Sequence, residues 1–258
     1  MEPKIIDVQG KKLYTEYHHF SEDSPTLVFL HDSLGCIQLW RDFPSELGKA
    51  TGCNVLVYDR LGYGKSLPML THKRENSYME AEADVLNDLL DALEINEALL
   101  FGHSDGGTIA LITASKYPGK IKAVICEAGH IFVEDITVKG VRDAWEAYQT
   151  TNLPERLAKY HGDKTEMLVR AWTEIWLSDR FRNWNIESLL KNITAPLLFI
   201  QGAEDEYGTL DQVEKTVSQV SGTAGKFIIS NAGHTPHKEV PKIVLEKAVS
   251  FINSILKE

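Results

Sequence analysis

A serine stands among glycines in residues 102–106, GHSDG, between the short apolar run 98–101 and the apolar-periodic run 108–117. A G-x-S-x-G pattern at a strand-to-helix turn is typical of a nucleophile elbow, which presents the serine oxygen at the carboxyl edge of a sheet. Its glycines leave room for the chain to bend sharply. The alternative is an ordinary turn with Ser104 as a helix N-cap. The motif and its context favour Ser104 as a nucleophile.

A serine at its ordinary pKa is a poor nucleophile, so a nearby base is required. Of the nine histidines, His234 lies directly after the run 226–230, which predicts the last strand. A loop at the carboxyl end of that strand would bring His234 to the same sheet edge as Ser104. His237 follows closely, but a proline and the coming helix are expected to turn it elsewhere, as a surface or capping residue.

The base needs a partner that orients its ring, and three acidic residues follow the strand predicted over 195–202. A carboxylate there could accept the imidazole N–H and hold the ring in place. We favour Asp205, with Glu204 and Glu206 as alternatives. The order serine, acid, histidine, each after a different strand, predicts nucleophilic catalysis more strongly than any of the three alone.

The elements that must position these residues alternate between strands and helices. Strands are predicted over 4–8, 12–18, 26–30, 54–59, 98–101, 122–127, 195–202 and 226–230, and helices over 38–49, 78–93, 108–117, 209–220 and 240–256. The first two strands form a hairpin around Gln9-Gly10, and capping boxes at Ser77 and Thr209 open two of the helices. Right-handed crossovers then build a mostly parallel sheet with helices on both faces.

The strand pattern breaks between about 130 and 190, where the sequence predicts only helical stretches, over 140–149, 154–161 and 165–179. Four of the five tryptophans lie in this segment. We interpret it as a helical insertion in a single domain spanning residues 1–258. One or two of Trp145, Trp172 and Trp176 are expected to line a substrate pocket, and the others to pack the insertion onto the core.

Charge and composition argue against several classes of function. The 258 residues carry a formal net charge of −10, which disfavours a nucleic-acid binder and a polybasic membrane attachment. The N-terminus has no signal-peptide pattern, and no run is long and apolar enough to span a membrane, so a cytoplasmic location is expected.

The cysteines point to neither a disulfide framework nor a zinc site. Cys36, Cys53 and Cys126 are odd in number and include no C-x-x-C pair. Cys36 is a candidate nucleophile, but an inert, buried cysteine is the favoured interpretation.

These motifs together resemble the α/β-hydrolase superfamily over nearly the whole chain. The resemblance rests on FLHDS after the third predicted strand, VYDRLGYGKS after the fourth, GHSDGG, GAEDEYG and GHTPH. It implies an α/β-hydrolase fold, with a mostly parallel eight-stranded sheet, helices on both faces and a helical cap at about 130–190. The family has a carboxylate after the next-to-last strand, which supports Asp205.

The family's oxyanion hole uses two backbone N–H groups, and the resemblance assigns both. One belongs to the residue after the nucleophile, here Asp105. The other comes from the loop after the third strand, usually just past a His-Gly pair, but this chain has histidine and aspartate at 31–32. The second donor is assigned to Ser33, with Leu34 as the alternative.

The stretch 59–66, DRLGYGKS, resembles a family loop motif of the form D-x-R-G-x-G-x-S, with the arginine displaced to Arg60. The resemblance implies a structural role for Arg60 in holding loops near the site, and no catalytic part.

The sequence therefore predicts a serine hydrolase that cleaves a small ester-like substrate without a metal or organic cofactor. The small-molecule substrate is the only partner predicted. Lactonase, thioesterase, C–C bond hydrolase, hydroxynitrile lyase and cofactor-free perhydrolase activities remain open, because the fold does not choose among them. Dehalogenases and epoxide hydrolases are disfavoured, since they carry aspartate where Ser104 stands. A third hypothesis is a non-enzymatic ligand receptor with the same fold.

Overall fold

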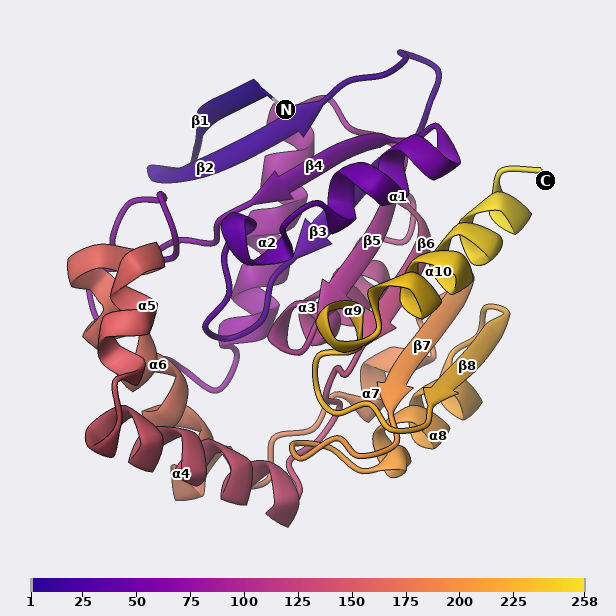
Figure 1. The fold of residues 1–258 in the computed structure, drawn as a ribbon. Coiled ribbons are helices and arrows are strands. Elements are labelled where there is room, and N and C mark those ends of the chain that lie inside the picture. Colours follow the sequence, from indigo (N-terminus) through magenta and orange to yellow (C-terminus); the bar gives the residue numbers. More distant parts are fainter. Residues whose placement is uncertain (1, 258) are drawn as a thin grey trace.

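One sheet of eight strands forms the centre of the computed structural model, which describes residues 2–257. Its strand order is β1-β2-β4-β3-β5-β6-β7-β8. The hairpin β1–β2 joins the sheet antiparallel, and the other neighbouring strands pair in parallel (Figure 1). The bounds are β1 Glu2–Val8, β2 Lys11–His18, β3 Thr26–Leu30, β4 Asn54–Tyr58, β5 Ala98–His103, β6 Ile121–Glu127, β7 Leu197–Gly202 and β8 Ala224–Ile229. The predicted mostly parallel eight-stranded sheet is confirmed.

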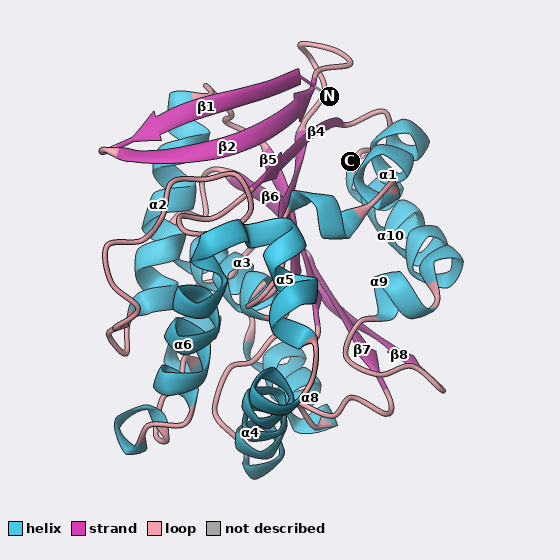
Figure 2. Cartoon of the chain, turned by 60° about the vertical axis from the view of Figure 1, so that its left-hand side comes forward, coloured by secondary structure: helices cyan, strands magenta, loops and turns pink. Residues whose placement is uncertain are grey.

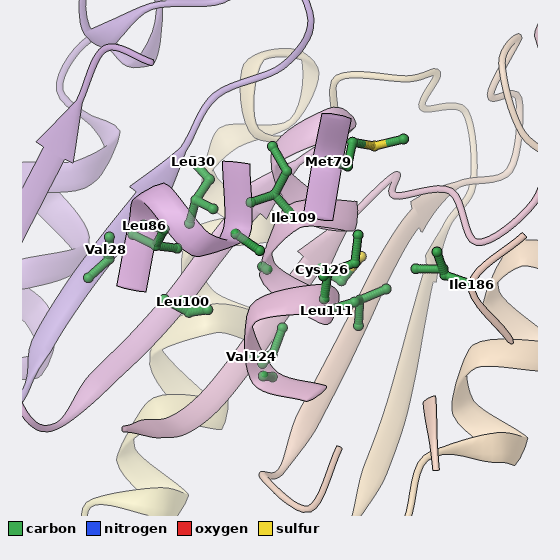
Figure 3. Packing of buried hydrophobic residues seen from close by; sticks show 14 of the residues in the cluster. Val28, Leu30, Met79, Leu86, Leu100, Ile109, Leu111, Val124, Cys126 and Ile186 are labelled. Atoms are coloured by element: carbon green, nitrogen blue, oxygen red, sulfur yellow. The ribbon is translucent and has the colours of Figure 1, made fainter. Parts of the chain in front are cut away.

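Helices cover both faces of this sheet, and each face has its own apolar core (Figure 2). The helices α2 (Tyr78–Ala92), α3 (Asp105–Lys116) and α8 (Leu210–Gln219) pack on one face, and α1 (Phe43–Thr51) and α10 (Pro241–Ile255) on the other. Alternate residues of one strand enter the two cores. In β3, Val28 and Leu30 pack with α2 and α3 (Figure 3), whereas Leu27 and Phe29 pack with α1. Burial on both faces explains the continuous apolar runs in the sequence.

Four further α-helices lie between β6 and β7. They are α4 (Asp135–Thr150), α5 (Leu153–His161), α6 (Thr165–Trp176) and the short α7 (Glu187–Leu190). An isolated antiparallel bridge between Phe132 and Asn185 joins the two ends of this segment. Figures 1 and 2 show α4, α5 and α6 grouped together beside the sheet.

Local differences from the expected elements have physical reasons. The expected helix over 38–49 is divided into a short 3₁₀ helix, η1 (Ile37–Trp40), and α1, because Arg41 between them adopts a φ of 53°. The capping box expected at Ser77 is wrong in detail, since within the described chain its side chain makes no capping hydrogen bond. Thr209 does cap α8 by accepting from the N–H of Asp211.

The last predicted helix, over 240–256, corresponds to α10, and a short helix that was not predicted, α9 (Pro236–Glu239), precedes it. The short α9 follows the loop that carries His234. Among residues 2–257, no helix has both the length and the apolar character needed to cross a membrane.

Candidate active site

Ser104 occupies a strained turn between β5 and α3. Its φ of 56° and ψ of −120° lie in a region that residues other than glycine rarely adopt. The flanking glycines are required by close backbone contacts. A Cβ on Gly102 would lie 2.1 Å from the carbonyl oxygen of Gly106, and one on Gly106 would lie 2.0 Å from that of Leu30. The turn has the backbone geometry of a nucleophile elbow.

The structure brings Ser104, His234 and Asp205 into one hydrogen-bonded chain. The Oγ of Ser104 lies 2.9 Å from Nε2 of His234, and Nδ1 of His234 lies 2.9 Å from each carboxylate oxygen of Asp205. Of the three acidic residues left open by the sequence, Asp205 is the one that contacts the ring. Glu204 is exposed to solvent, and Glu206 lies on the wall of the adjoining pocket.

Asp205 is held as a carboxylate by several donors. Its oxygens accept from Nε2 of Gln201 at 2.7 Å and from the backbone N–H groups of Tyr207 and Gly208 at 2.8 and 3.3 Å. Burial alone would raise the pKa of Asp205, but the hydrogen bond and charge of His234, together with the Tyr207 N–H, hold it below its usual value. The ionised form therefore predominates at neutral pH.

The same pairing raises the pKa of the base. Burial disfavours a charged imidazole, yet the hydrogen bond and charge of Asp205 outweigh it, and Glu206 and Asp32 add to the effect. The pKa of His234 is consequently raised above its ordinary value. The ring is thereby suited to take a proton from Ser104 and to be stabilised as a cation while holding it.

A pocket of about 260 Å³ opens beside Ser104. Ser104 and His234 line it, and part of its wall comes from α4, α5 and α6 through Thr137, Val141, Ala144, Leu153, Trp172 and Trp176. Trp145, the third tryptophan considered from the sequence, is not among the described lining residues. It stacks instead on Tyr148, with ring centroids 5.9 Å apart. Of the three tryptophans, Trp172 and Trp176 therefore line this cavity, and the role of either in binding a substrate stays a prediction.

The residues proposed to form the oxyanion hole lie on the wall of this pocket. Ser33, Leu34 and Asp105 all line it beside Ser104. Asp32, which replaces the family's usual glycine, is accommodated because Gly35 has no side chain: a Cβ there would lie 2.0 Å from Oδ1 of Asp32.

His130 and Tyr207 are among the lining residues that the sequence did not single out, and they are the two whose rings lie near that of His234. The Nε2–H of His130 donates to the carbonyl oxygen of Tyr207 at 3.0 Å, and the two rings lie 6.0 and 4.6 Å from that of His234. Both residues follow predicted strands, at the edge where Ser104 stands, and that position was the available signal. Burial and the proximity of His234 lower the pKa of His130, so it is neutral at pH 7.

The sequence analysis assigned a role only to the backbone N–H of Asp105, but the side chain of this residue also makes buried contacts. Its carboxylate is buried and accepts from the hydroxyl of Tyr78 at 3.1 and 3.2 Å. Two buried guanidinium groups lie near it, with Nη1 of Arg60 at 3.6 Å and Nη1 of Arg74 at 3.9 Å from Oδ2. The residue after the nucleophile is therefore part of an ionic cluster beneath the elbow.

The expected surface or capping role of His237 is wrong. The residue is only 4% exposed, and its backbone N–H and Nδ1–H donate to Glu127 at 2.6 and 2.8 Å. The reason is that α9 folds back over the end of β6, where Glu127 stands. Cys36 is buried, and burial together with the charge of Asp59 raises the pKa of its thiol to about 12, which fits the interpretation of an inert cysteine.

Within residues 2–257, no group of three or more His, Cys, Asp or Glu side chains is arranged to hold a metal ion.

The chain is similar to known proteins in its family pattern, its sequence and its fold. A family model described as alpha/beta hydrolase fold matches residues 25–166. The human protein named serine hydrolase BPHL is 30% identical over 207 residues, covering 78% of this chain and 69% of that protein. An (R)-3-hydroxydecanoyl-ACP:CoA transacylase from Pseudomonas putida is 25% identical over 260 residues, covering 91% and 85%.

Among solved structures, MGS-M2, an alpha/beta hydrolase enzyme from a deep-sea metagenome library, superposes with a TM-score of 0.77 and 23% identity over 97% of each chain. At this level of identity the structural match concerns the fold.

Proposed function

The chain belongs to the alpha/beta hydrolase family and is a hydrolytic enzyme, and from this premise we propose that it cleaves small carboxylic esters through an acyl-enzyme on Ser104. The observation that carries the proposal is the chain of hydrogen bonds from Ser104 through His234 to Asp205. It has the mutual geometry that nucleophilic catalysis needs: a nucleophile in contact with a base, and a base oriented by a carboxylate.

In the first half-reaction, Oγ of Ser104 attacks the ester carbonyl carbon, and Nε2 of His234 takes the hydroxyl proton. The carbonyl oxygen becomes an oxyanion held by the N–H groups of Asp105 and Ser33. When the tetrahedral intermediate collapses, the bond to the leaving alkoxide breaks and His234 returns the proton to it. Asp205 stabilises the imidazolium throughout and stays ionised.

In the second half-reaction, water takes the place of the departed alcohol. His234 accepts a proton from this water as its oxygen attacks the acyl carbon. Collapse of the second intermediate breaks the bond to Oγ of Ser104, which regains a proton from His234. The products are a carboxylic acid and an alcohol, and the enzyme returns to its initial state.

We propose a small acyl group and a cap role for the inserted helices. A cavity of about 260 Å³ is slightly smaller than the roughly 300–1,000 Å³ that is usual for small-molecule sites. Its walls from α4, α5 and α6 are mainly apolar, with Trp172 and Trp176 the largest side chains. On this proposal residues 130–190 form a helical cap within the single domain, and the cap limits the substrate's length.

The test is the Ser104→Ala variant, assayed with p-nitrophenyl acetate and butyrate. Loss of turnover with an unchanged melting temperature is expected, whereas Ser218→Ala, at an exposed serine on α8, keeps full activity. Undiminished turnover by Ser104→Ala contradicts the proposal. Parallel assays of lactones and acyl thioesters establish which leaving group the site prefers.

A further inference from the structure

The carbonyl oxygen of Asp32, in the loop after β3, accepts three hydrogen bonds. Nη2 of Arg60 donates at 2.8 Å, Nδ1 of His31 at 2.8 Å and the backbone N–H of Gly35 at 3.2 Å. The third bond closes a four-residue turn from Asp32 to Gly35. This carbonyl is therefore fixed in direction more firmly than most loop carbonyls.

Arg60 acts on this carbonyl in two ways. Its guanidinium donates directly, and its backbone N–H donates to Nε2 of His31 at 3.1 Å. Because Nε2 of His31 accepts that bond, the ring's proton resides on Nδ1, from which it is donated to Asp32. Burial and the charge of Arg60 hold the pKa of His31 well below its ordinary value, so the ring remains in this neutral form.

The direction of the Asp32 carbonyl fixes that of the Ser33 N–H. The two belong to one peptide group, which is planar and trans, so they point in opposite directions. The carbonyl points toward Arg60, which has none of its surface exposed, whereas Ser33 lines the pocket beside Ser104. The Ser33 N–H is therefore turned away from the buried guanidinium and toward the pocket.

Arg60 also contacts the residue that supplies the other N–H. Its Nη1 lies 3.6 Å from the buried carboxylate of Asp105. An uncompensated carboxylate at this place would oppose an oxyanion forming at the Asp105 N–H. One fully buried guanidinium thus contacts the carbonyl oxygen of the peptide group that carries the Ser33 N–H and lies beside the carboxylate of Asp105.

We propose that Arg60 is a positioning residue for the oxyanion hole, which directs the Ser33 N–H at the substrate carbonyl and selects Ser33 over Leu34 as the second donor. This inference rests on the proposed function, because an oxyanion hole has a purpose only if Ser104 attacks a carbonyl. Hydrogen bonds to the Asp32 oxygen also polarise the peptide and make the Ser33 N–H a stronger donor. Arg60 then acts mainly on the transition state.

The experiment compares two paired substitutions, Arg60→Met with Asp105→Asn and Arg74→Met with Asp105→Asn. The change to asparagine removes the buried negative charge, so neither pair leaves a carboxylate without its cation. Both arginines neighbour Asp105, but the described contacts of the Arg74 side chain are with Asp105, the Tyr63 hydroxyl and the Tyr78 ring, and none is with Asp32. The matched pairs therefore separate neutralisation of Asp105 from control of the Ser33 N–H.

The readouts are kcat and KM for p-nitrophenyl acetate, and the inhibition constant of an aryl trifluoromethyl ketone, which forms a hemiketal oxyanion on the serine. The Arg60 pair is expected to have a kcat about tenfold to a hundredfold below that of the Arg74 pair, with KM within about twofold. The ketone should bind more weakly by a similar factor. Equal kcat values in the two pairs, or a loss confined to KM, overturn the inference.

A second variant guards against misfolding of the Arg60 pair. Arg60→Lys keeps the positive charge but replaces the planar fork by a point charge, so it loses orientation more than electrostatics. It is expected to lower kcat more than Arg74→Lys does, and equal effects overturn the inference. If the Arg60 variants keep the kcat of the wild-type enzyme, only this inference is contradicted. Full turnover by Ser104→Ala contradicts the proposed function itself.

Discussion

Two carboxylate–histidine pairs lie at the same edge of the sheet, yet their surroundings differ. In the first, Asp205 accepts from Nδ1 of His234, and in the second, Glu127 accepts from Nδ1 of His237 at 2.8 Å. The ring of His103 lies between them, 5.2 Å from that of His234 and 4.9 Å from that of His237. A carboxylate partner is thus common to both.

The two pairs differ in the group that each histidine ring contacts on the side away from its carboxylate. Nε2 of His234 contacts Oγ of Ser104 at the pocket, whereas the ring of His237 packs 4.5 Å from that of Trp40. The pKa of His234 is raised by Asp205, but burial lowers that of His237 even though Glu127 opposes the shift. A paired imidazole thus becomes a base only where its second nitrogen reaches a nucleophile and a substrate.

The largest expected effect comes from exchanging each histidine for glutamine. His234→Gln should lower kcat on the order of 10⁵-fold, because no group remains to take the serine proton. His237→Gln should keep kcat within about tenfold of wild type, since its ring does not touch the nucleophile. Steady-state kinetics with p-nitrophenyl acetate measures both, and comparable losses in the two variants would break the distinction between the pairs.

Substitution of the two carboxylates should have different effects: Asp205 is expected to matter mainly for activity and Glu127 mainly for stability. Asp205→Asn is expected to lower kcat on the order of 10⁴-fold, as the ring loses its orientation and its charged partner. Glu127→Gln should chiefly lower the free energy of unfolding, by about 1–3 kcal/mol, because a buried acceptor of two hydrogen bonds is weakened. Urea denaturation and kcat are measured on both variants. A Glu127→Gln enzyme as inactive as Asp205→Asn is the contrary result.

The pH dependence of activity sharpens the contrast further. His234 must be neutral to accept the proton, so kcat/KM should fall as pH drops through its pKa, which Asp205 raises. Removing that charge with Asp205→Asn should move the acid limb of the residual activity to lower pH, by about one unit. Glu127→Gln should leave the limb in place. If the acid limb moves in Glu127→Gln but not in Asp205→Asn, Asp205 is not the residue that raises the pKa of the catalytic base.

The smallest effect is expected at His103, which links the two pairs. Its Nε2–H donates to the backbone carbonyl of His234 at 2.8 Å, so it helps to hold the loop of the base. His103→Leu should lower kcat about threefold to tenfold with little change in KM, and His103→Gln, which keeps a donor, should recover part of the loss. No difference between these two variants would show that the hydrogen bond does not position the base.

The sequence was sufficient for features that depend on local pattern and chain order. Continuous apolar runs predicted the buried strands, and the glycines around Ser104 predicted a turn whose close contacts the structure shows. Strand order placed His234 and an acidic loop at one edge, although sequence alone left Glu204 and Glu206 open beside Asp205.

Features that depend on packing between distant segments could not be predicted. His237 is buried because α9 returns to the end of β6, and no local signal marks that contact. Which tryptophan faces the pocket depends on how α4 and α6 sit on the core: Trp172 lines it and Trp145 does not. The sequence predicted only a structural role for Arg60 in holding loops near the site. Its hydrogen bond to the Asp32 carbonyl could not be predicted, because it joins residues 28 positions apart.

Site mapping of a fluorophosphonate adduct by mass spectrometry of wild-type, His234→Gln and His237→Gln protein tests most directly whether Ser104 is the nucleophile and His234 its base. A phosphonate on Ser104 is predicted in wild type and in His237→Gln, with labelling slowed on the order of 10³-fold or more in His234→Gln. An active wild-type enzyme that carries no adduct on Ser104 would contradict these roles. So would a His234→Gln protein that is labelled on Ser104 as fast as wild type.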